Sequence, residues 1–282
     1  MIKQIVVESE YFNPTDTLEC GQIFRYSKLD NGAYLVLSGH RACQISLNEN
    51  KVIITCNEED YDYFYNYFDL ETDYFSIYQC AQNSSFEVLK RASALGKGVR
   101  ILRQGSQEMI YSFLISQNNN IPRIKKSVNL ICEKLGEKKQ FLGNEYYAFP
   151  TCEKLAEQSI EFYKECGLGY RAEYMKTVSE SLVDGLISKL TALSHEQIKS
   201  ELVKIKGIGE KVANCVCLFG FYKTRSFPVD TWIEKIYRED FNGTLTDRNK
   251  INEYFLNLFG ENSGYFQQYL FYYKRTLEKK QN

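Results

Sequence analysis

The first third of the chain alternates apolar and polar residues with the period of two that is typical of β-strands. The apolar positions are rich in β-branched and aromatic residues, and turn sequences at residues 30–32 (D-N-G) and 48–50 (N-E-N) separate the segments. Short strands joined by such turns predict an antiparallel meander. The expected strands are residues 2–7, 22–26, 33–38, 42–47 and 52–56.

From residue 107 onward the apolar positions follow the period of an α-helix. A β-rich first part followed by a helical second part predicts an α+β fold with two regions, residues 1–103 and 104–282. The expected helices of the second region are residues 108–115, 121–135, 152–158, 161–165, 171–187, 195–205, 210–221, 231–237, 248–259 and 265–278.

Two glycines interrupt the helical pattern within residues 203–221. Gly207 and Gly209 stand on either side of Ile208, between two apolar-periodic segments. Glycines at this spacing permit a tight turn with positive φ and the close approach of another backbone. The segment therefore predicts a helix–hairpin–helix unit, whose backbone N–H groups at a helix N-terminus suit an anion such as a phosphate.

Lys211 and Asp230 give this region its candidate chemistry. Lys211 falls in the first turn of the second helix, where the positive end of the helix dipole disfavours the ammonium form. A neutral lysine amine is a nucleophile that forms Schiff bases. Asp230 lies in the loop 226–232, directly before a helical run, and is predicted to cap that helix. We expect a rigid, ionised carboxylate close to the atom that the lysine attacks.

Each feature has an ordinary explanation when it stands alone. A helix–hairpin–helix unit is only a binding module in many proteins, and an aspartate at a helix start is more often a plain cap than a catalyst. A lysine in a first turn is usually solvated. The combination favours catalysis, because Lys211 lies two residues after Gly209 and Asp230 lies nineteen residues after Lys211.

The net charge conceals an asymmetry between the two regions. The 282 residues carry 35 Lys and Arg against 36 Asp and Glu, a formal net charge of −1. Residues 1–96 hold 7 basic and 14 acidic side chains, whereas residues 97–282 hold 28 and 22. The basic excess lies in the part that contains the hairpin, as expected if this part binds nucleic-acid phosphates.

Cysteine usage and hydropathy exclude some classes of protein. The nine cysteines show no small-domain disulfide spacing, which indicates a reducing compartment. Cys215 and Cys217 lie two apart on an expected helix, so they face different sides and are poorly spaced for a metal. The chain contains no apolar run long enough to cross a membrane and no signal peptide.

The stretch from residue 203 to residue 240 resembles the helix-hairpin-helix plus Gly/Pro/Asp motif of the DNA base-excision glycosylases. A lysine after G-I-G-E is similar to that of the bifunctional glycosylase/lyases of this superfamily. Further segments resemble its 8-oxoguanine DNA glycosylase branch, in what looks like a prokaryotic version of the eukaryotic-type enzyme. They are C-G-Q-I-F-R-Y (20–26), I-L-R-Q (101–104), S-F-L-I-S-Q-N-N-N-I-P-R-I (112–124), G-L-G-Y-R-A (167–172) and G-Y-F-Q-Q-Y-L-F (264–271).

The resemblance covers nearly the whole chain and implies a fold. It implies an N-terminal TATA-binding-protein-like antiparallel α+β domain packed on helical subdomains, with the active site between them. It also implies that the four-cysteine iron–sulfur loop of endonuclease III-like enzymes is absent, because no cysteine follows Asp230.

The resemblance assigns a pocket for the damaged base. It implies that the Gly21 carbonyl accepts a hydrogen bond from N7–H of 8-oxoguanine, an atom that carries a lone pair in normal guanine. It makes Gln267 the partner of the Watson–Crick edge, Phe271 one stacking wall and Cys215 the other. Gln267 and Phe271 lie four apart and so share a helix face. Without the resemblance, Phe271 and Cys215 are typical core residues.

A second group is assigned to the rest of the duplex. The resemblance implies that Asn118 fills the space left by the flipped nucleotide, that Tyr170 wedges into the stack, and that Arg123 and Arg171 bind the orphaned cytosine. Trp232 stands where animal enzymes have a histidine near a phosphate, and indole offers only one N–H donor. We therefore expect Trp232 to stack or pack beside the DNA.

The implied function is a bifunctional 8-oxoguanine DNA glycosylase/AP lyase that acts opposite cytosine. The expected partner is double-stranded DNA, with no membrane, and we expect a monomer in the cytoplasm of a prokaryote, or in the nucleus of a eukaryote. No cofactor is expected to be required, although hairpin backbone carbonyls are suited to a structural cation. Two alternatives stay open: a glycosylase of the same fold for another damaged purine, and a non-catalytic DNA-binding or damage-sensing protein.

Overall fold

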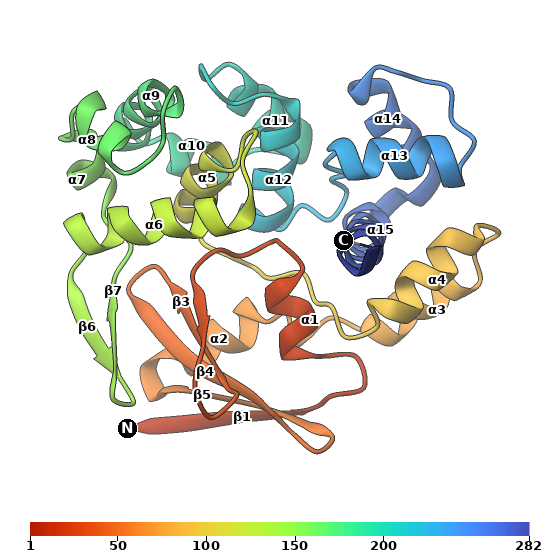
Figure 1. The fold of residues 1–282 in the computed structure, drawn as a ribbon, viewed down its shortest axis with the longest axis horizontal. Coiled ribbons are helices and arrows are strands. Elements are labelled where there is room, and N and C mark those ends of the chain that lie inside the picture. Colours follow the sequence, from red (N-terminus) through yellow and green to blue (C-terminus); the bar gives the residue numbers. More distant parts are fainter. Residues whose placement is uncertain (282) are drawn as a thin grey trace.

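The N-terminal part folds around a five-stranded antiparallel sheet with strand order β1-β5-β4-β3-β2 (Figure 1). The computed structural model describes residues 1–281, with side chains as far as residue 278. Tight turns connect β3, β4 and β5, so the predicted meander is confirmed. The strands are β1 (Ile2–Glu8), β2 (Tyr26–Lys28), β3 (Tyr34–Ser38), β4 (Arg41–Asn48) and β5 (Lys51–Asn57).

The predicted strand at residues 22–26 is wrong, because β2 begins only at Tyr26. The preceding residues form an irregular loop, and the buried side chain of Gln22 supplies the hydrogen bonds that a strand would have made. Its Nε2 donates to the Arg100 carbonyl at 2.7 Å, and its Oε1 accepts from the Leu102 N–H at 2.8 Å. Gln22 thus ties this loop to the segment that leads into the helical region.

Two short helices cover the sheet. α1 (Pro14–Glu19) and α2 (Tyr61–Tyr67) contribute to a hydrophobic core that also holds the inward-facing residues of β1, β3, β4 and β5. The buried aromatic residues Phe12, Phe64 and Phe68 lie at its centre. Burying large aromatic side chains against alternating strand positions stabilises this layer.

A second, larger core holds the helical region. The helices are α3 (Tyr74–Gln82), α4 (Glu87–Leu95), α5 (Ser106–Ile115), α6 (Ile121–Leu135), α7 (Cys152–Ala156), α8 (Ile160–Glu165), α9 (Arg171–Val183), α10 (Leu186–Thr191), α11 (His195–Val203), α12 (Glu210–Gly220), α13 (Thr231–Asp240), α14 (Arg248–Phe259) and α15 (Ser263–Gln281). Among the described residues, none of these helices is both long and apolar enough to span a membrane.

Two local features differ from the expected helical pattern. The single helix expected at residues 171–187 is two helices, because Gly185 adopts a left-handed conformation with φ +83° between α9 and α10. An additional hairpin, β6 (Lys138–Phe141) and β7 (Asn144–Tyr147), turns at Gly143, whose φ is +79°. Both differences arise where a glycine takes a backbone conformation that other residues rarely adopt.

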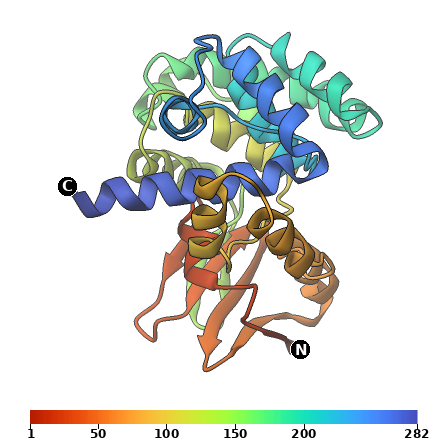
Figure 2. The same ribbon diagram turned by 90° about the vertical axis from the view of Figure 1, so that its right-hand side faces the viewer.

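Helix α15 lies between the helical region and the N-terminal sheet (Figure 2). Helices α3 and α4 follow the sheet in sequence, but their apolar residues belong to the same core as α15. The last long helix of the chain is therefore held by elements from the first hundred residues. This packing brings residues from both ends of the sequence to one place.

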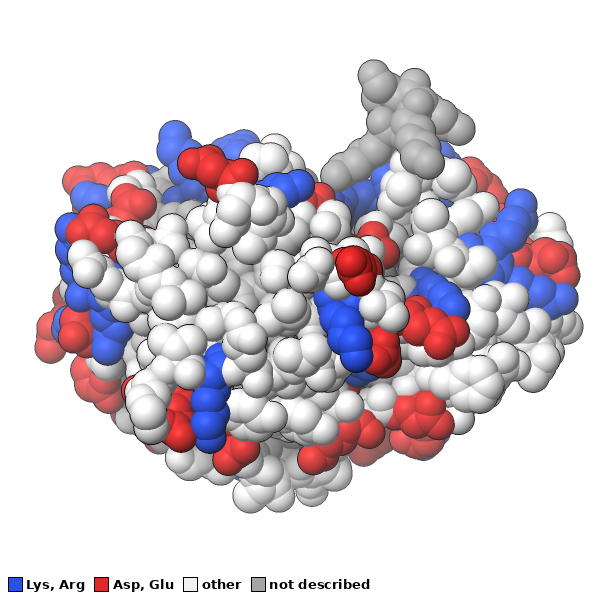
Figure 3. Space-filling view, turned by 90° about the horizontal axis from the view of Figure 1, so that it is seen from below, with Lys and Arg blue, Asp and Glu red and all other residues white. Residues whose placement is uncertain are grey.

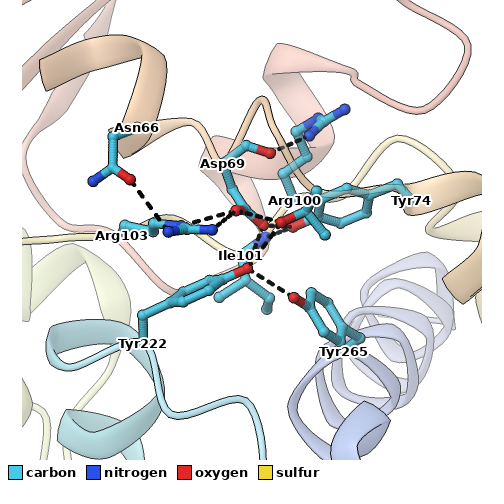
Figure 4. Close-up of polar contacts among 9 residues, drawn as sticks. Asn66, Asp69, Tyr74, Arg100, Ile101, Arg103, Tyr222 and Tyr265 are labelled. Atoms are coloured by element: carbon cyan, nitrogen blue, oxygen red, sulfur yellow. Dashed lines mark hydrogen bonds and ion pairs between the residues drawn. The ribbon is translucent and has the colours of Figure 1, made fainter. Parts of the chain in front are cut away.

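Asp69 joins the parts of the molecule through a buried polar network (Figure 4). Its carboxylate accepts from Arg103 Nη2 at 2.6 Å, from the Tyr222 hydroxyl at 2.6 Å and from the Tyr74 hydroxyl at 2.8 Å. The hydroxyls of Tyr222 and Tyr265 lie 2.7 Å apart. Asp69 thus connects the loop after α2 with the end of α12 and the start of α15.

The face seen from below Figure 1 belongs largely to the N-terminal sheet and its helices (Figure 3). Lysine and arginine side chains alternate there with aspartate and glutamate among uncharged residues. Nucleic-acid backbones bind to concentrated positive charge, and this face shows mixed charges instead. Phosphate contacts are therefore expected on the face that carries the hairpin.

Replacing Asp69 with asparagine should lower the free energy of unfolding by about 3 kcal/mol. Asparagine tolerates the left-handed backbone of this position, where φ is +54°, so the loss comes from the side chain. The change removes the charge partner of Arg103 and places an NH₂ group against hydroxyl donors. Denaturant unfolding measures the difference. Asp73→Asn is the control, because Asp73 is an exposed cap of α3 and asparagine caps equally well; equal losses in both variants would contradict the role of the network.

Candidate active site

The predicted hairpin lies between α11 and α12. Gly207 has φ +98°, and a Cβ atom there would lie 2.4 Å from Cγ of Tyr174, so only glycine fits. Gly209 is the extended N-cap residue of α12. Gln117 Nε2 donates to the Gly207 carbonyl at 2.8 Å, which ties the hairpin to the end of α5. The hairpin residues line a cavity of about 370 Å³ at the molecular surface.

Lys211 lies in the first turn of α12 and is half-buried. Its ammonium nitrogen is 5.6 Å from the ring centroid of Phe113. One helical turn further on, Cys215 lines the same cavity as Lys211. Burial raises the pKa of Cys215, and the neighbouring lysine opposes part of this rise. The lysine thus stands beside a neutral thiol in a largely apolar setting.

Asp230 caps α13, as predicted. Its Oδ1 accepts from the N–H groups of Trp232 and Ile233, both at 3.0 Å, so the carboxylate is held rigidly. Burial raises the pKa of Asp230 above its ordinary value, while the backbone N–H of Ile233 and the charge of Lys211 oppose this rise. The carboxylate therefore ionises less readily than the sequence suggested.

The four residues assigned to the damaged base line one small cavity together with Lys211 and Asp230. Its volume is about 50 Å³, and it is lined by Gly21, Cys215, Gln267, Phe271 and both candidate catalytic residues. Several of these residues also line a larger neighbouring cavity of about 1090 Å³. Residues from four separate stretches of the chain thus meet at one place.

Gln267 presents an unused acceptor in this cavity. Its Nε2 donates to the Pro228 carbonyl at 3.2 Å, but its buried Oε1 has no hydrogen-bond partner among the described residues. The side chain is only 4% exposed. An unpaired buried carbonyl costs about 1–3 kcal/mol, so this oxygen is suited to a ligand that donates a hydrogen bond.

Gly21 brings the loop before β2 into the same cavity. Its φ is +99°, and a Cβ atom there would lie 2.9 Å from Nη1 of Arg275 and 3.2 Å from the Phe271 ring. Any larger residue would therefore enter the space beside Phe271. The requirement for glycine at this position is one of conformation and of space.

The residues assigned to the opposite strand gather at the turn after α5, but they differ in exposure. Asn118 is exposed with φ +45°, Arg123 is exposed, and Tyr170 is 55% exposed. Arg171 is buried, and its guanidinium donates to the carbonyls of Gln117 and Asn118. Arg171 thus braces this turn, while the other three side chains point outward from the protein.

The structure adds residues that the sequence interpretation missed. Arg275 and Lys125 line the larger cavity, beside the half-buried Trp232 that the sequence had already indicated. Arg275 follows Gln267 and Phe271 at intervals of four on α15, so helical spacing alone was a usable signal. Gln117 and Lys125 carried no such signal. Among the described residues, no group of three or more His, Cys, Asp and Glu side chains is arranged to hold a metal ion.

A glycine hairpin is followed by a first-turn lysine, and this lysine shares a cavity with a helix-capping aspartate. This combination defines the class of this protein. Residues 111–260 match the family model of the HhH-GPD superfamily of base excision DNA repair proteins, and the chain belongs to this family. Residues 4–110 match the model of the 8-oxoguanine DNA glycosylase N-terminal domain. The expected family and fold are thus confirmed.

Similar proteins span most of the chain. The structure of Clostridium acetobutylicum 8-oxoguanine glycosylase/lyase, in complex with double-stranded DNA containing cytosine opposite 8-oxoguanine, superposes with a TM-score of 0.92 at 36% identity, covering 99% of this chain and 98% of that one. The N-glycosylase/DNA lyase of Saccharomyces cerevisiae is 33% identical over a matched region that covers 56% of this chain and 45% of the yeast protein. A probable N-glycosylase/DNA lyase of Methanothermobacter thermautotrophicus is 28% identical over 74% of this chain and 72% of its own length.

Replacing Asp230 with asparagine should raise the melting temperature at neutral pH. Because burial raises the pKa of Asp230, the folded protein binds the proton more tightly than the unfolded chain, and stability falls as pH rises through the raised pKa. Asparagine keeps the helix cap and does not ionise. The gain should be present at pH 7 and absent below the ordinary aspartate pKa of about 3.9. Thermal melts at both pH values measure it, and a variant less stable than the wild type at pH 7 would contradict the prediction.

Proposed function

We propose that this protein is a bifunctional base-excision repair enzyme that removes 8-oxoguanine from duplex DNA and then cleaves the strand at the abasic site. The observation that supports this most directly is the single small cavity lined by Lys211, Asp230 and Gln267, next to the phosphate-binding hairpin. A nucleophile, a carboxylate and a free hydrogen-bond acceptor meet where a flipped base would enter. The named relatives with this fold are glycosylase/lyases.

Lys211 is the nucleophile in this proposal. Its nitrogen lone pair forms a bond to C1′ of the sugar while the N-glycosidic bond breaks. The base leaves with the two electrons of the broken bond and takes up a proton. Loss of a proton from the nitrogen and opening of the sugar ring give a protonated imine. Removal of a C2′ proton then expels the 3′ phosphate. None of these steps uses an oxidant, a reductant or a metal.

Asp230 acts electrostatically. Its ionised carboxylate stabilises the positive charge that develops on the sugar as the N-glycosidic bond breaks. The N–H groups of Trp232 and Ile233 hold it in place, so little reorganisation is needed during the reaction. The same carboxylate is suited to accept the proton that Lys211 must lose before it attacks.

The base is recognised by the backbone and by one amide. The Gly21 carbonyl accepts from N7–H of 8-oxoguanine, whereas normal guanine would direct a lone pair at that oxygen. Leaving two acceptors face to face in a dry pocket costs about 1–3 kcal/mol, which rejects the undamaged base. Gln267 pairs with the Watson–Crick edge through its free Oε1 and its Nε2. Phe271 and Cys215 form the two walls.

The opposite strand is read at the turn after α5. Asn118 and Tyr170 are exposed and suited to fill and wedge the stack. Arg123 is free to direct its donor fork at the acceptors of an orphaned cytosine. Arg171 holds the backbone of this turn and donates to cytosine only if it exchanges some of its internal hydrogen bonds.

The wider setting follows from the same proposal. A structural cation would bind to backbone carbonyls of residues 203–209, which line a surface cavity, but the Gly207 carbonyl is already used by Gln117. The enzyme acts as a monomer on double-stranded DNA, in the compartment that holds the chromosome, which is the cytoplasm in a prokaryote. Chemistry at Lys211 requires no dissociable cofactor.

Borohydride trapping tests the reaction. Duplex DNA with 8-oxoguanine opposite cytosine should give a covalent adduct with the wild type, and an undamaged duplex should give none. Lys211→Gln should abolish the adduct, because glutamine has no amine to form an imine. Lys204→Gln is the matched control, since Lys204 is an exposed lysine of the same hairpin, and it should keep the adduct.

Each other outcome has a distinct meaning. Release of free base without an adduct would identify a monofunctional enzyme and refute the role of Lys211. Activity on a duplex with a different damaged purine, and none on 8-oxoguanine, would replace the substrate. Lesion binding without base release or adduct would identify a damage-sensing protein.

Replacing Arg123 and replacing Arg171 should have different effects on stability and on the preference for the opposite base. Arg123→Ala should leave stability unchanged and reduce the preference for cytosine over adenine opposite the lesion, because an exposed donor fork is lost. Arg171→Ala should lower the free energy of unfolding by about 1–3 kcal/mol, since buried carbonyls of the turn lose their donors. Unfolding curves and single-turnover excision rates with both opposite bases measure the pair. Equal stability losses in both variants would contradict this assignment.

A further inference from the structure

The larger cavity beside the active site carries unneutralised positive charge. Three carboxylates line it: Glu278 pairs with Lys235 at 2.6 Å, whereas Glu19 and Asp230 accept hydrogen bonds from neutral donors and keep their charge, so two carboxylates face the cations of the cavity. The cations that line it are Lys28, Lys125, Lys211 and Arg275. Within the described part of the chain, none of them forms an ion pair with a carboxylate.

Arg275 is the most unusual of these cations. It lies on α15, one turn after Phe271, with Nη1 close to the α-carbon of Gly21. Nη1 is buried and has no hydrogen-bond partner among the described residues. A buried charged donor without an acceptor is costly, and native proteins usually satisfy such a group. The guanidinium is therefore placed for an acceptor that arrives with the substrate.

Lys125 faces the same cavity from α6. Its ammonium nitrogen lies 3.6 Å from the ring centroid of Tyr26, and the side chain is half-buried. Burial lowers the pKa of Lys125, and the charge of Glu19 opposes part of this fall. The ring face attracts the cation but supplies no hydrogen-bond acceptor. Lys125 and Arg275 thus stand on different helices around one cavity, and among the described residues neither forms an ion pair.

We propose that Arg275 and Lys125 form a phosphate clamp that holds the backbone of the lesion strand beside the flipped nucleotide. The proposal rests on the function proposed above, because it assumes that the nucleotide enters the cavity next to Lys211. Guanidinium groups bind phosphate oxygens through paired N–H donors, and lysine binds them as a point charge. The clamp places the sugar between the hairpin on one side and α15 on the other.

A phosphate fits this cavity better than the base does. The base-sized cavity is lined by Gln267, Cys215 and Phe271, and neither Arg275 nor Lys125 lines it. Both cations line the larger cavity, where the strand must pass to reach the small one. Trp232 lies there too and adds one N–H donor beside the two cations.

The salt dependence of DNA binding tests the clamp. The probe is a duplex with a tetrahydrofuran abasic-site analogue, which has phosphates but no base and no bond that Lys211 can break. Each phosphate contact contributes about 0.9 to the slope of log K against log salt concentration. Arg275→Gln should therefore lower the slope by about 0.9 and weaken binding roughly tenfold. Arg275→Gln with Lys125→Gln should lower the slope by about twice as much.

Matched variants separate a phosphate contact from a structural effect. Arg275→Lys should retain most of the slope, because the charge remains. Lys134→Gln is the control for net charge, since Lys134 is an exposed residue at the other end of α6, and it should leave the slope unchanged. Arg275→Gln should not lower the melting temperature, because it removes a half-buried charge whose buried Nη1 has no hydrogen-bond partner among the described residues.

An unchanged slope in Arg275→Gln would overturn the clamp, even if affinity fell. The same holds if the variant loses only its discrimination between 8-oxoguanine and guanine, because Arg275 would then act on the base. The probe carries no base and forms no adduct, so the borohydride experiment can fail while the salt slope still falls as expected. The two proposals are therefore tested separately.

Discussion

The carboxylate of Asp69 is the constraint on which the geometry of the site depends. It is buried, and it satisfies donors from the start of α3, from the segment that enters the helical region and from the end of α12. Through Tyr222 it also reaches Tyr265, two residues before Gln267 on α15. The helix that carries Lys211 and the helix that carries Gln267 are thus anchored to one charge. Such networks specify a single arrangement of elements, since a partly satisfied alternative is costly.

The cavities differ from this network, because some buried polar atoms there have no hydrogen-bond partner among the described residues. Gln267 Oε1 and Arg275 Nη1 are buried and unpaired, and the pKa of Asp230 is raised by its burial. Each of these groups lowers the stability of the free protein, and in the proposed function each gains a partner from the nucleic acid. Stability supplied by networks such as that of Asp69 allows the site to hold groups in this unsatisfied state.

The hairpin is connected to the turn after α5 through hydrogen bonds of Gln117. The hairpin is rigid, because Gly207 packs against the Tyr174 ring and its carbonyl accepts from Gln117. Gln117 in turn accepts from Arg171, so the hairpin and the turn that carries Asn118 are connected through one residue. The position of the hairpin is thereby linked to the position of Asn118 and its neighbours.

The sequence by itself determined the hairpin, the first-turn position of Lys211 and the capping role of Asp230, because turns, helix starts and caps depend on interactions within a few residues. It also determined the strands of the meander and most helices, through the period of their apolar positions. Only the tertiary structure decided that residues 22–25 form a loop instead of the predicted strand, that Arg171 braces a turn and that Nη1 of Arg275 has no hydrogen-bond partner among the described residues. These properties depend on neighbours far away in the sequence, and no local pattern records which distant side chain fills or leaves a space.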